Sequence, residues 1–269
     1  MFVIFGAFAI AIALLVIPGN PSLMENPDAI KPGMVLEILS TSLYDNFFLA
    51  GAIILGSAII LTVIGSYFEA GAIGMANRAS EKGTATIGDM FTYGKENFVN
   101  LFLIKFILLL IMLAGIIFVV PGILTIGNFE TFLLNPEEAI SGAFILVLGM
   151  LLWTIYIMVV ELIFTYSEYA VVVEKLDPVG ALEKGFSVFM QNKLDTFLLW
   201  LFIISMSIII AIIGQTLGTV EILGTLWSFA DFVISFAVVQ PLITIWWTRM
   251  FLRRTGQEVY DIDDYLKYP

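Results

Sequence analysis

The stretch TYSEYAVVVEKLDPVGALEKGFSVFMQNKLDTFL (residues 165–198) contains the pattern that decides the fold. It begins at the end of one apolar segment, passes through a polar linker and enters another apolar segment. Much of it occurs earlier in the chain, where Glu69 corresponds to Glu168 and Asn97 corresponds to Asn192. The copies are offset by 99 residues at the glutamates (168 − 69) and by 95 at the asparagines (192 − 97). We therefore predict a duplicated membrane hairpin: an apolar helix, a short amphipathic linker and a second apolar helix, occurring twice in parallel.

The composition around this stretch is that of a membrane protein. The chain has 269 residues, of which 60% are hydrophobic and 13% charged, whereas a soluble domain has about a quarter of its residues charged. Long apolar runs between the few charges predict an all-α integral membrane bundle. A net charge of −11 argues against a nucleic-acid surface, which needs a basic footprint.

The apolar runs predict six transmembrane helices, at about residues 2–17, 47–67, 101–120, 142–164, 196–213 and 227–247. They form a membrane domain over residues 1–248, which a cytoplasmic tail follows at 249–269. A cleaved signal peptide is the alternative for residues 2–17, although no basic residue precedes that apolar run. A loop is expected at residues 214–226, which are rich in glycine.

Aromatic and proline residues place the last helix. Trp227 and Trp247 are about twenty residues apart, which is about 30 Å along a helix and matches the hydrocarbon thickness. Trp favours the two membrane interfaces. Pro241 lacks an N–H, so it should leave the carbonyl of Ala237 without its usual donor and kink the helix.

Both polar linkers contain signals for the start of a helix. Thr86 and Asp89 have the spacing of a capping box, and Asp177-Pro178 combines an N-cap aspartate with proline at the first helical position. Apolar residues follow at helical spacing, which predicts amphipathic helices on the membrane surface. In the first linker these are Ile87, Met90, Phe91 and Phe98, with Asp89, Lys95 and Glu96 expected to face water; in the second they are Val179, Leu182, Phe186 and Phe189.

The distribution of basic residues predicts the orientation. Of twelve Lys and Arg residues, ten lie in the two linkers and the tail, and Lys105 lies close to the first linker. Only Lys31 falls on the opposite side. The positive-inside rule then places both linkers and both termini in the cytoplasm of a multi-pass protein of the cell membrane. The tail cluster Arg249, Arg253 and Arg254 is explained by this topology and by attraction to anionic lipid.

The chain contains neither Cys nor His, which narrows the available chemistry. Disulfides, thiolate nucleophiles, Cys/His zinc sites and histidine acid–base schemes are excluded. We expect no cofactor, no metal site and no catalytic residue, and the absence of a recognisable catalytic motif favours a protein that is not an enzyme.

Five charged residues are candidates for a binding site or an ion pair: Lys105, Glu161, Glu69, Glu168 and Asp231. Lys105 and Glu161 lie inside the ends of consecutive predicted helices, so a mutual ion pair is expected. Glu69 and Glu168 occupy equivalent ends of the two copies; they either form a pair of carboxylates at a cytoplasmic mouth or each pair with a nearby lysine. Asp231 either couples an ion or bonds neighbouring hydroxyls near the outer interface.

The second linker and its flanks resemble a known family. The residues are Tyr166-Ser-Glu-Tyr-Ala-Val-Val-Val-Glu, then Asp177-Pro-Val-Gly-Ala-Leu-Glu-Lys-Gly-Phe-Ser, and Gln191-Asn192. They resemble the polytopic membrane-domain family found fused to some glycerophosphodiester phosphodiesterases, together with its uncharacterised stand-alone relatives. The resemblance covers the last four helices best and implies the membrane architecture. It transfers no active-site residue, because the hydrolase chemistry of such fusions depends on histidine.

Three functions follow for a chain of this kind. The first is a non-enzymatic membrane protein that organises lipid or binds a membrane partner. The second is a transporter for a small molecule or ion that uses the charged residues named above. The weakest is a lipid-acting enzyme with carboxylates as its acid–base groups. The expected partners are the lipid bilayer and a second membrane protein, and the sequence leaves the oligomeric state open.

Overall fold

A computed structural model describes residues 47–126 and 140–260, and these residues form helices and no strand. Five described helical segments are long and apolar enough to cross a membrane: Gly51–Lys82, Ile87–Phe118, Ile140–Val173, Lys193–Leu217 and Ile222–Arg254. Each overlaps one of the predicted spans, so the described part is all-helical, with five candidate spans, and is consistent with a multi-pass membrane protein. The predicted first span, residues 2–17, lies outside the described residues.

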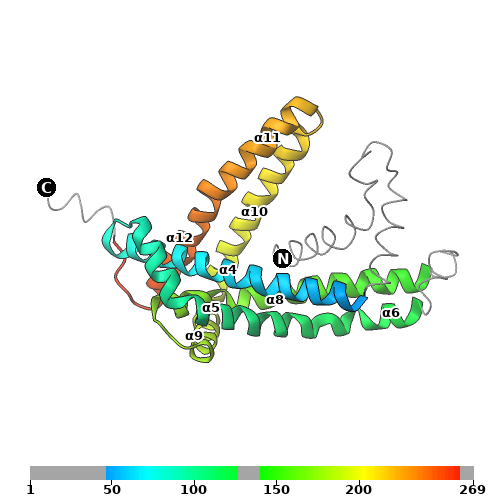
Figure 1. Ribbon diagram of the computed structural model, residues 1–269, viewed down its shortest axis with the longest axis horizontal. Helices are drawn as coiled ribbons and strands as arrows, with labels where there is room; N and C mark the ends of the chain where they lie inside the picture. Colours follow the sequence, from blue (N-terminus) through cyan, green and yellow to red (C-terminus); the bar gives the residue numbers. More distant parts are fainter. Residues whose placement is uncertain (1–46, 127–139, 261–269) are drawn as a thin grey trace. The chain divides into compact units, whose positions relative to one another are not determined.

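The elements follow one another as shown in Figure 1. The helices are α4 (Phe47–Lys82), α5 (Ile87–Ala114), α6 (Val120–Ile126), α8 (Ile140–Val173), α9 (Pro178–Gln191), α10 (Lys193–Leu217), α11 (Glu221–Ile234) and α12 (Gln240–Arg254). A 3-10 segment, η2 (Gly115–Phe118), lies between α5 and α6, and a π-helical segment, η3 (Ser235–Val239), joins α11 to α12.

The chain divides between Ser66 and Tyr67 into two compact units. Residues 47–66 of α4 belong to the first unit, whose described side chains are mostly apolar. The hydroxyls of Ser57 and Thr62 bond carbonyls one turn back in the same helix, at 2.6 and 2.7 Å. Polar side chains in this segment are therefore satisfied inside the helix, as a lipid environment demands.

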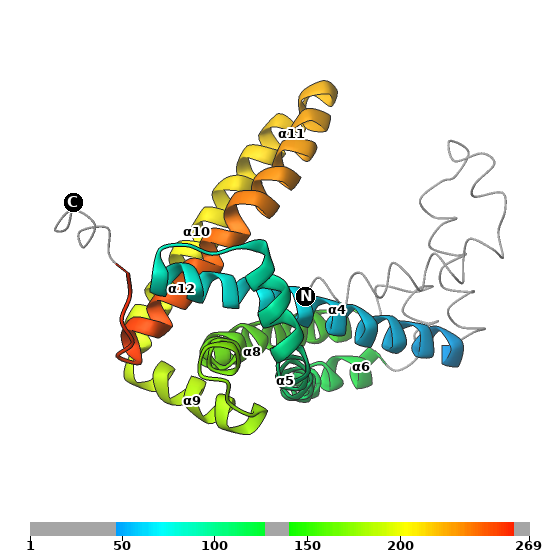
Figure 2. The same ribbon diagram turned by 60° about the vertical axis from the view of Figure 1, so that its left-hand side comes forward.

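The second unit contains a close pair of helices, α5 and α8, with α6 also packed against α8 (Figures 1 and 2). Gly122 and Gly149 allow this approach, because a Cβ at Gly122 would overlap Leu146 and one at Gly149 would overlap the carbonyl of Phe118. Small residues permit such contact between helices where no hydrophobic driving force acts in lipid.

The bend between α5 and α6 begins at Gly115, where the 3-10 segment η2 starts. The tighter 3-10 turn disturbs the α-helical ladder and leaves carbonyls that need donors. Tyr156 donates its hydroxyl to the carbonyl of Ile111, and the Trp153 indole donates to that of Met112, both at 2.9 Å. The α8 side chains thus satisfy the backbone of α5 at the bend.

The buried core of this unit centres on residues 166–172 of α8, inside the stretch that organises the sequence. Tyr166, Ala170, Val171 and Val172 are fully buried there. The side chains around them come from α5, α9, α12 and the second part of α4, among them Ile73, Leu101, Val188 and Phe251. Five helices therefore meet at one end of the unit, where the apolar segments join the polar linkers.

The predicted loop at residues 214–226 is wrong. Helix α10 continues to Leu217 and α11 begins at Glu221, so a turn of three residues, 218–220, joins a helical hairpin. The turn is closed by Gly218 and Gly224 N–H groups, which donate to the carbonyls of Gly214 and Val220. The glycine content suggested a loop, because glycine disfavours helix. In the structure, helical backbone hydrogen bonds continue through most of these glycines, so both apolar helices are longer than predicted.

The last span starts earlier and ends later than its predicted bounds of 227–247. Upstream of Pro241 the helix widens into η3, where the N–H of Gln240 donates to the carbonyl of Ser235, five residues back. A π-turn of this kind accommodates the missing proline donor. The helix then continues to Arg254, past the predicted start of the tail at residue 249.

Candidate functional site

Three of the five candidate residues meet at one point. The Lys105 ammonium of α5 contacts the Glu69 carboxylate of α4 and lies 3.6 Å from Oε1 of Glu168 in α8. Each residue comes from a different helix, and all three belong to the second unit. We call Glu69, Lys105 and Glu168 the carboxylate–lysine cluster.

The expected pair of Lys105 with Glu161 is therefore wrong. Glu161 is exposed and makes no ion pair with a described residue. The difference is one of level along the helix: Glu168 lies two turns, about 10 Å, further along α8, where α8 meets Lys105, and the second part of α4 adds Glu69. Adjacency in sequence suggested the wrong glutamate.

The carboxylate–lysine cluster is partly shielded from solvent and carries one excess negative charge when all three groups are ionised. Its side chains are 39% exposed at Glu69, 25% at Lys105 and 23% at Glu168. A charge at that depth among apolar helices is costly unless it is paired. The cluster pairs the lysine twice, so it joins three helices at one level.

The cluster does not extend along α5 into the apolar part of the unit. The residues of α5 that flank Lys105 on the inner face are Leu101, Ile104 and Leu108, all buried. Val160, on α8, is buried with them. The charged groups therefore lie at one end of a dry, apolar contact between the helices.

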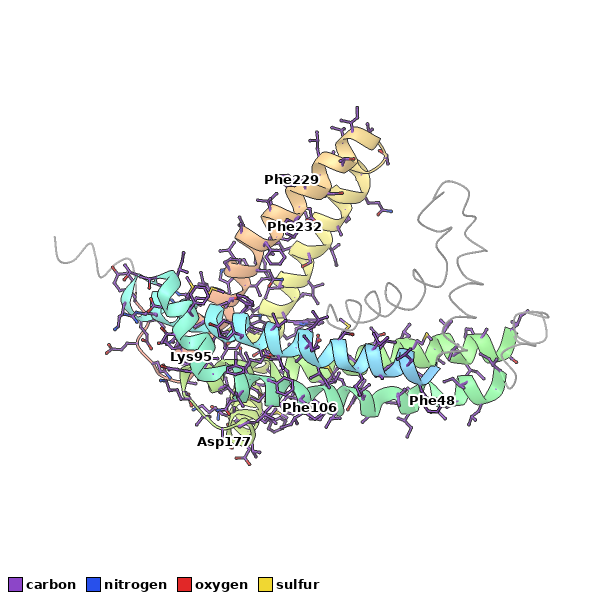
Figure 3. All side chains as sticks on the ribbon, in the orientation of Figure 1. Phe48, Lys95, Phe106, Asp177, Phe229 and Phe232 are labelled. Carbon is purple, nitrogen blue, oxygen red and sulfur yellow. The ribbon has the colours of Figure 1, made fainter. Side chains whose placement is uncertain are left out.

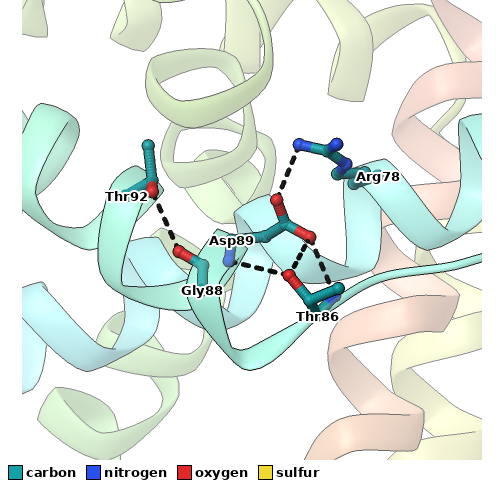
Figure 4. Close-up of polar contacts among 5 residues, drawn as sticks. All are labelled: Arg78, Thr86, Gly88, Asp89 and Thr92. Atoms are coloured by element: carbon teal, nitrogen blue, oxygen red, sulfur yellow. Dashed lines mark hydrogen bonds and ion pairs between the residues drawn. The ribbon is translucent and has the colours of Figure 1, made fainter.

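A second polar network fixes the start of α5 (Figure 4). The Asp89 carboxylate accepts from the backbone N–H of Thr86 at 2.8 Å, and the N–H of Asp89 donates to the Thr86 hydroxyl at 3.3 Å. This confirms the predicted capping box. Asp89 was expected to face water, but it is buried and its other oxygen lies 2.6 Å from Arg78 of α4. The cap therefore also joins α4 to α5.

The second linker is fixed in a similar way. Asp177 accepts from the N–H of Gly180 with Pro178 at the first helical position, which confirms the predicted start of α9. Lys184 pairs with Glu174 at 3.1 Å, across the turn between α8 and α9. A Cβ at Gly185 would overlap Ser167, so α9 packs closely on the end of α8.

Sequence reasoning missed a buried hydroxyl pair between α8 and α10. The Tyr166 hydroxyl and the Thr196 hydroxyl lie 3.0 Å apart, and both residues are fully buried. The Tyr166 ring packs edge-on against Trp247, with ring centroids 5.7 Å apart. The pair joins α8, α10 and α12. Its only sequence signal is the tyrosine two residues before the repeated glutamate.

Asp231 lies apart from these groups on α11. Its carboxylate accepts from the Ser235 hydroxyl at 3.4 Å, one turn further along the same helix. A bond to a neighbouring hydroxyl was one of the two interpretations given for Asp231 from the sequence.

An open groove lies between α10 and α12 at the basic end of the last helix. Its volume is about 760 Å³. The residues that line it include Leu199 and Phe202 of α10, and Trp246, Arg249, Arg253 and Arg254 of α12. Arg254 is held by Asp195 of α10. We call this feature the arginine groove.

Comparison with known proteins places the chain in a family. A family model described as a domain of unknown function, DUF7847, matches residues 35–252. The chain belongs to this family. It is also similar to an uncharacterized protein of Archaeoglobus fulgidus, with 26% identity over 215 residues that cover 78% of this chain and 70% of that protein. No solved structure matches the chain. The family match covers the helices that form the cluster, and it ends at residue 252, before Arg253 and Arg254 of the groove.

Proposed function

We propose that this protein is a multi-pass membrane protein that acts without catalysis, by organising lipid or by binding a membrane partner. The observation that carries the proposal is that the charges of the carboxylate–lysine cluster are paired with one another. Lys105 is paired by two carboxylates, and the α5 face beyond it is sealed by Ile104 and Leu108. Charges that are paired at one end of an apolar contact join the helices there.

The exposed surface supports the same proposal. Large apolar side chains point outward along the spanning helices; Phe229 and Phe232 of α11, labelled in Figure 3, are 72% and 61% exposed. Contiguous apolar surface of this extent is suited to lipid or to a protein partner in the membrane.

We further propose that both linkers lie on the cytoplasmic leaflet, with both termini on that side. The proposal draws on the positive-inside distribution of Lys and Arg. In α9, Ala181 and Val188 are buried, while the larger Val179 and Phe186 are 60% and 41% exposed. Exposed apolar side chains on a short helix beside a membrane protein are expected to enter the headgroup region.

An internal parallel repeat is part of this proposal. Glu69 and Glu168, which correspond in the two copies, converge on Lys105. The amides of Asn97 and Asn192 each donate to the carbonyl four residues back, both at 2.9 Å. The copies differ in that α5 runs through Asn97, whereas α9 and α10 separate at Asn192. The resemblance to membrane domains fused to phosphodiesterases stays a prediction.

The experiment that tests the proposal uses the absence of cysteine. Single cysteines are introduced at Phe186 and at Gln191, which is also exposed but lies on another face of α9, and a spin label is attached to each in protein reconstituted into phosphatidylcholine vesicles. Labels at Phe186 should be accessible to oxygen dissolved in lipid, and labels at Gln191 to a water-soluble nickel reagent. Equal accessibility to the nickel reagent at both positions would show that the linker does not lie on the membrane surface.

A transporter is the second candidate, and one observation favours it. The carboxylate–lysine cluster has an excess carboxylate, and Glu69 is its most exposed member. A monovalent cation or an amine could exchange there. Flux of sodium, potassium or protons into vesicles that falls in the Glu69→Gln variant would support transport. Flux equal to that of protein-free vesicles supports the interaction role.

A further inference from the structure

The arginine groove combines two kinds of lining that a membrane lipid requires. Trp246, Arg249 and Arg253 are three and four residues apart on α12, so they share one helix face. The Trp246 ring packs edge-on against Phe202 of α10, with centroids 5.4 Å apart. One end of the groove is therefore aromatic and apolar, and the other end is cationic.

The three arginines differ in what they already bind. Arg254 is paired with Asp195, and Arg249 uses one N–H in a 3.4 Å bond to the backbone carbonyl of Tyr260. Arg253 is exposed and makes no hydrogen bond or ion pair with a described residue. With three guanidiniums and one carboxylate, the groove has an excess of two positive charges. Guanidinium groups bind phosphate oxygens in a planar, bidentate geometry.

We propose that the arginine groove binds the phosphate headgroup of an anionic membrane lipid. Arg253 and Arg249 contact the phosphate oxygens, and Trp246 and Phe202 pack against the glycerol and the first methylenes of the lipid. Tryptophan is suited to this level of the membrane because its ring is apolar and its N–H is polar. The inference rests on the proposed membrane location and names the lipid class for it.

Two observations favour a lipid over a free anion or a diffuse attraction. The groove volume of about 760 Å³ is many times the roughly 30 Å³ that one water occupies, and half of its named lining is apolar, which a small anion does not use. The chain as a whole carries a charge of −11, so long-range attraction to an anionic surface is opposed. Binding must therefore come from the local arginines.

The test measures binding of phosphatidylglycerol to the full chain in neutral detergent, by native mass spectrometry. The variant Arg253→Gln should bind phosphatidylglycerol about tenfold more weakly, which corresponds to one charged contact of about 1.4 kcal/mol. Arg253→Lys should fall between that variant and the natural chain, because it keeps the charge and loses the bidentate fork. The control Lys95→Gln removes one exposed positive charge from α5, outside the groove, and should leave binding unchanged.

Three outcomes would overturn the inference. The first is equal binding by Arg253→Gln and Lys95→Gln. The second is equal affinity for phosphatidylcholine and phosphatidylglycerol. The third is displacement of the lipid by an equal concentration of inorganic phosphate, which would assign the groove to a free anion. These three outcomes leave the proposed function standing, because the spin labels on α9 test it separately. If α9 were exposed to water while the lipid still bound the groove, the proposed function would be refuted and the lipid site would remain.

Discussion

Replacement of Lys105 by methionine tests the carboxylate–lysine cluster most directly. The side chain keeps its length and loses its charge, so Glu69 and Glu168 are left facing each other without a cation. Removal of one partner from a fully buried pair costs about 3–5 kcal/mol. These side chains are 23–39% exposed, and solvent screening reduces the cost to about 2 kcal/mol. A loss of that size lowers Tm by about 4–8 °C for a chain of this length.

Replacement of one carboxylate instead of the lysine should change the stability little. In Glu69→Gln, Lys105 keeps Glu168 as a partner and the excess negative charge is gone, so the free energy of unfolding should change by less than about 0.5 kcal/mol. The triple variant, with glutamine at Glu69 and Glu168 and methionine at Lys105, should recover most of the stability that Lys105→Met alone loses, because no charge is left unpaired. Glu161→Gln is the control, since Glu161 is exposed and has no described ion-pair partner.

The assay is thermal unfolding of the purified chain in detergent, followed by tryptophan fluorescence. The five tryptophans provide the signal, and size-exclusion chromatography checks that each variant is monodisperse before heating. The reasoning fails if Lys105→Met melts at the same temperature as Glu161→Gln. It also fails if Glu69→Gln is as damaging as Lys105→Met, because the lysine would then depend on both carboxylates for a reason other than charge.

Two further predictions concern contacts between helices. Gly185→Ala places a Cβ against the α8 backbone and should lower the free energy of unfolding by about 1–3 kcal/mol. The control Gly88→Ala, whose Cβ meets only a 3.5 Å contact, should be neutral or stabilising in the same melting assay. Equal effects of the two variants would contradict the close approach of α9 to α8. Tyr156→Phe leaves the Ile111 carbonyl without its donor and should cost about 1 kcal/mol. Hydrogen exchange should rise near η2 in that variant and not in Thr154→Val, whose hydroxyl bonds only its own helix.

Much of the local structure could be predicted from sequence because it depends on neighbours along the chain. The Thr86–Asp89 capping box and the Asp177 cap both form where their spacing indicated. Each is a contact within three residues, so no other part of the fold has to be known. The prediction of a loop at residues 214–226 was wrong because it used only the glycine composition, which does not show the backbone hydrogen bonds that close the turn.

The candidate site was predicted in part. Lys105, Glu69 and Glu168 were singled out as charges near helix ends, and the structure brings them together. The partner assigned to Lys105 was wrong because Glu161 and Glu168 lie two turns apart on one side of α8, so the choice between them depends on how far α8 is shifted along α5. This shift is set by packing, here by glycine contacts such as Gly149 with Phe118.

The stretch at residues 165–198 shows where sequence and tertiary structure divide. Its apolar run, its Asp177-Pro178 start and its composition determine by themselves that a spanning helix, a turn and a second helix follow one another, since hydrophobicity and capping act locally. Tertiary structure alone decided that Tyr166 meets Thr196, that Glu168 reaches Lys105, and that α10 and α12 line the arginine groove. These contacts join residues far apart in the chain, and their geometry depends on the packing of whole helices against one another.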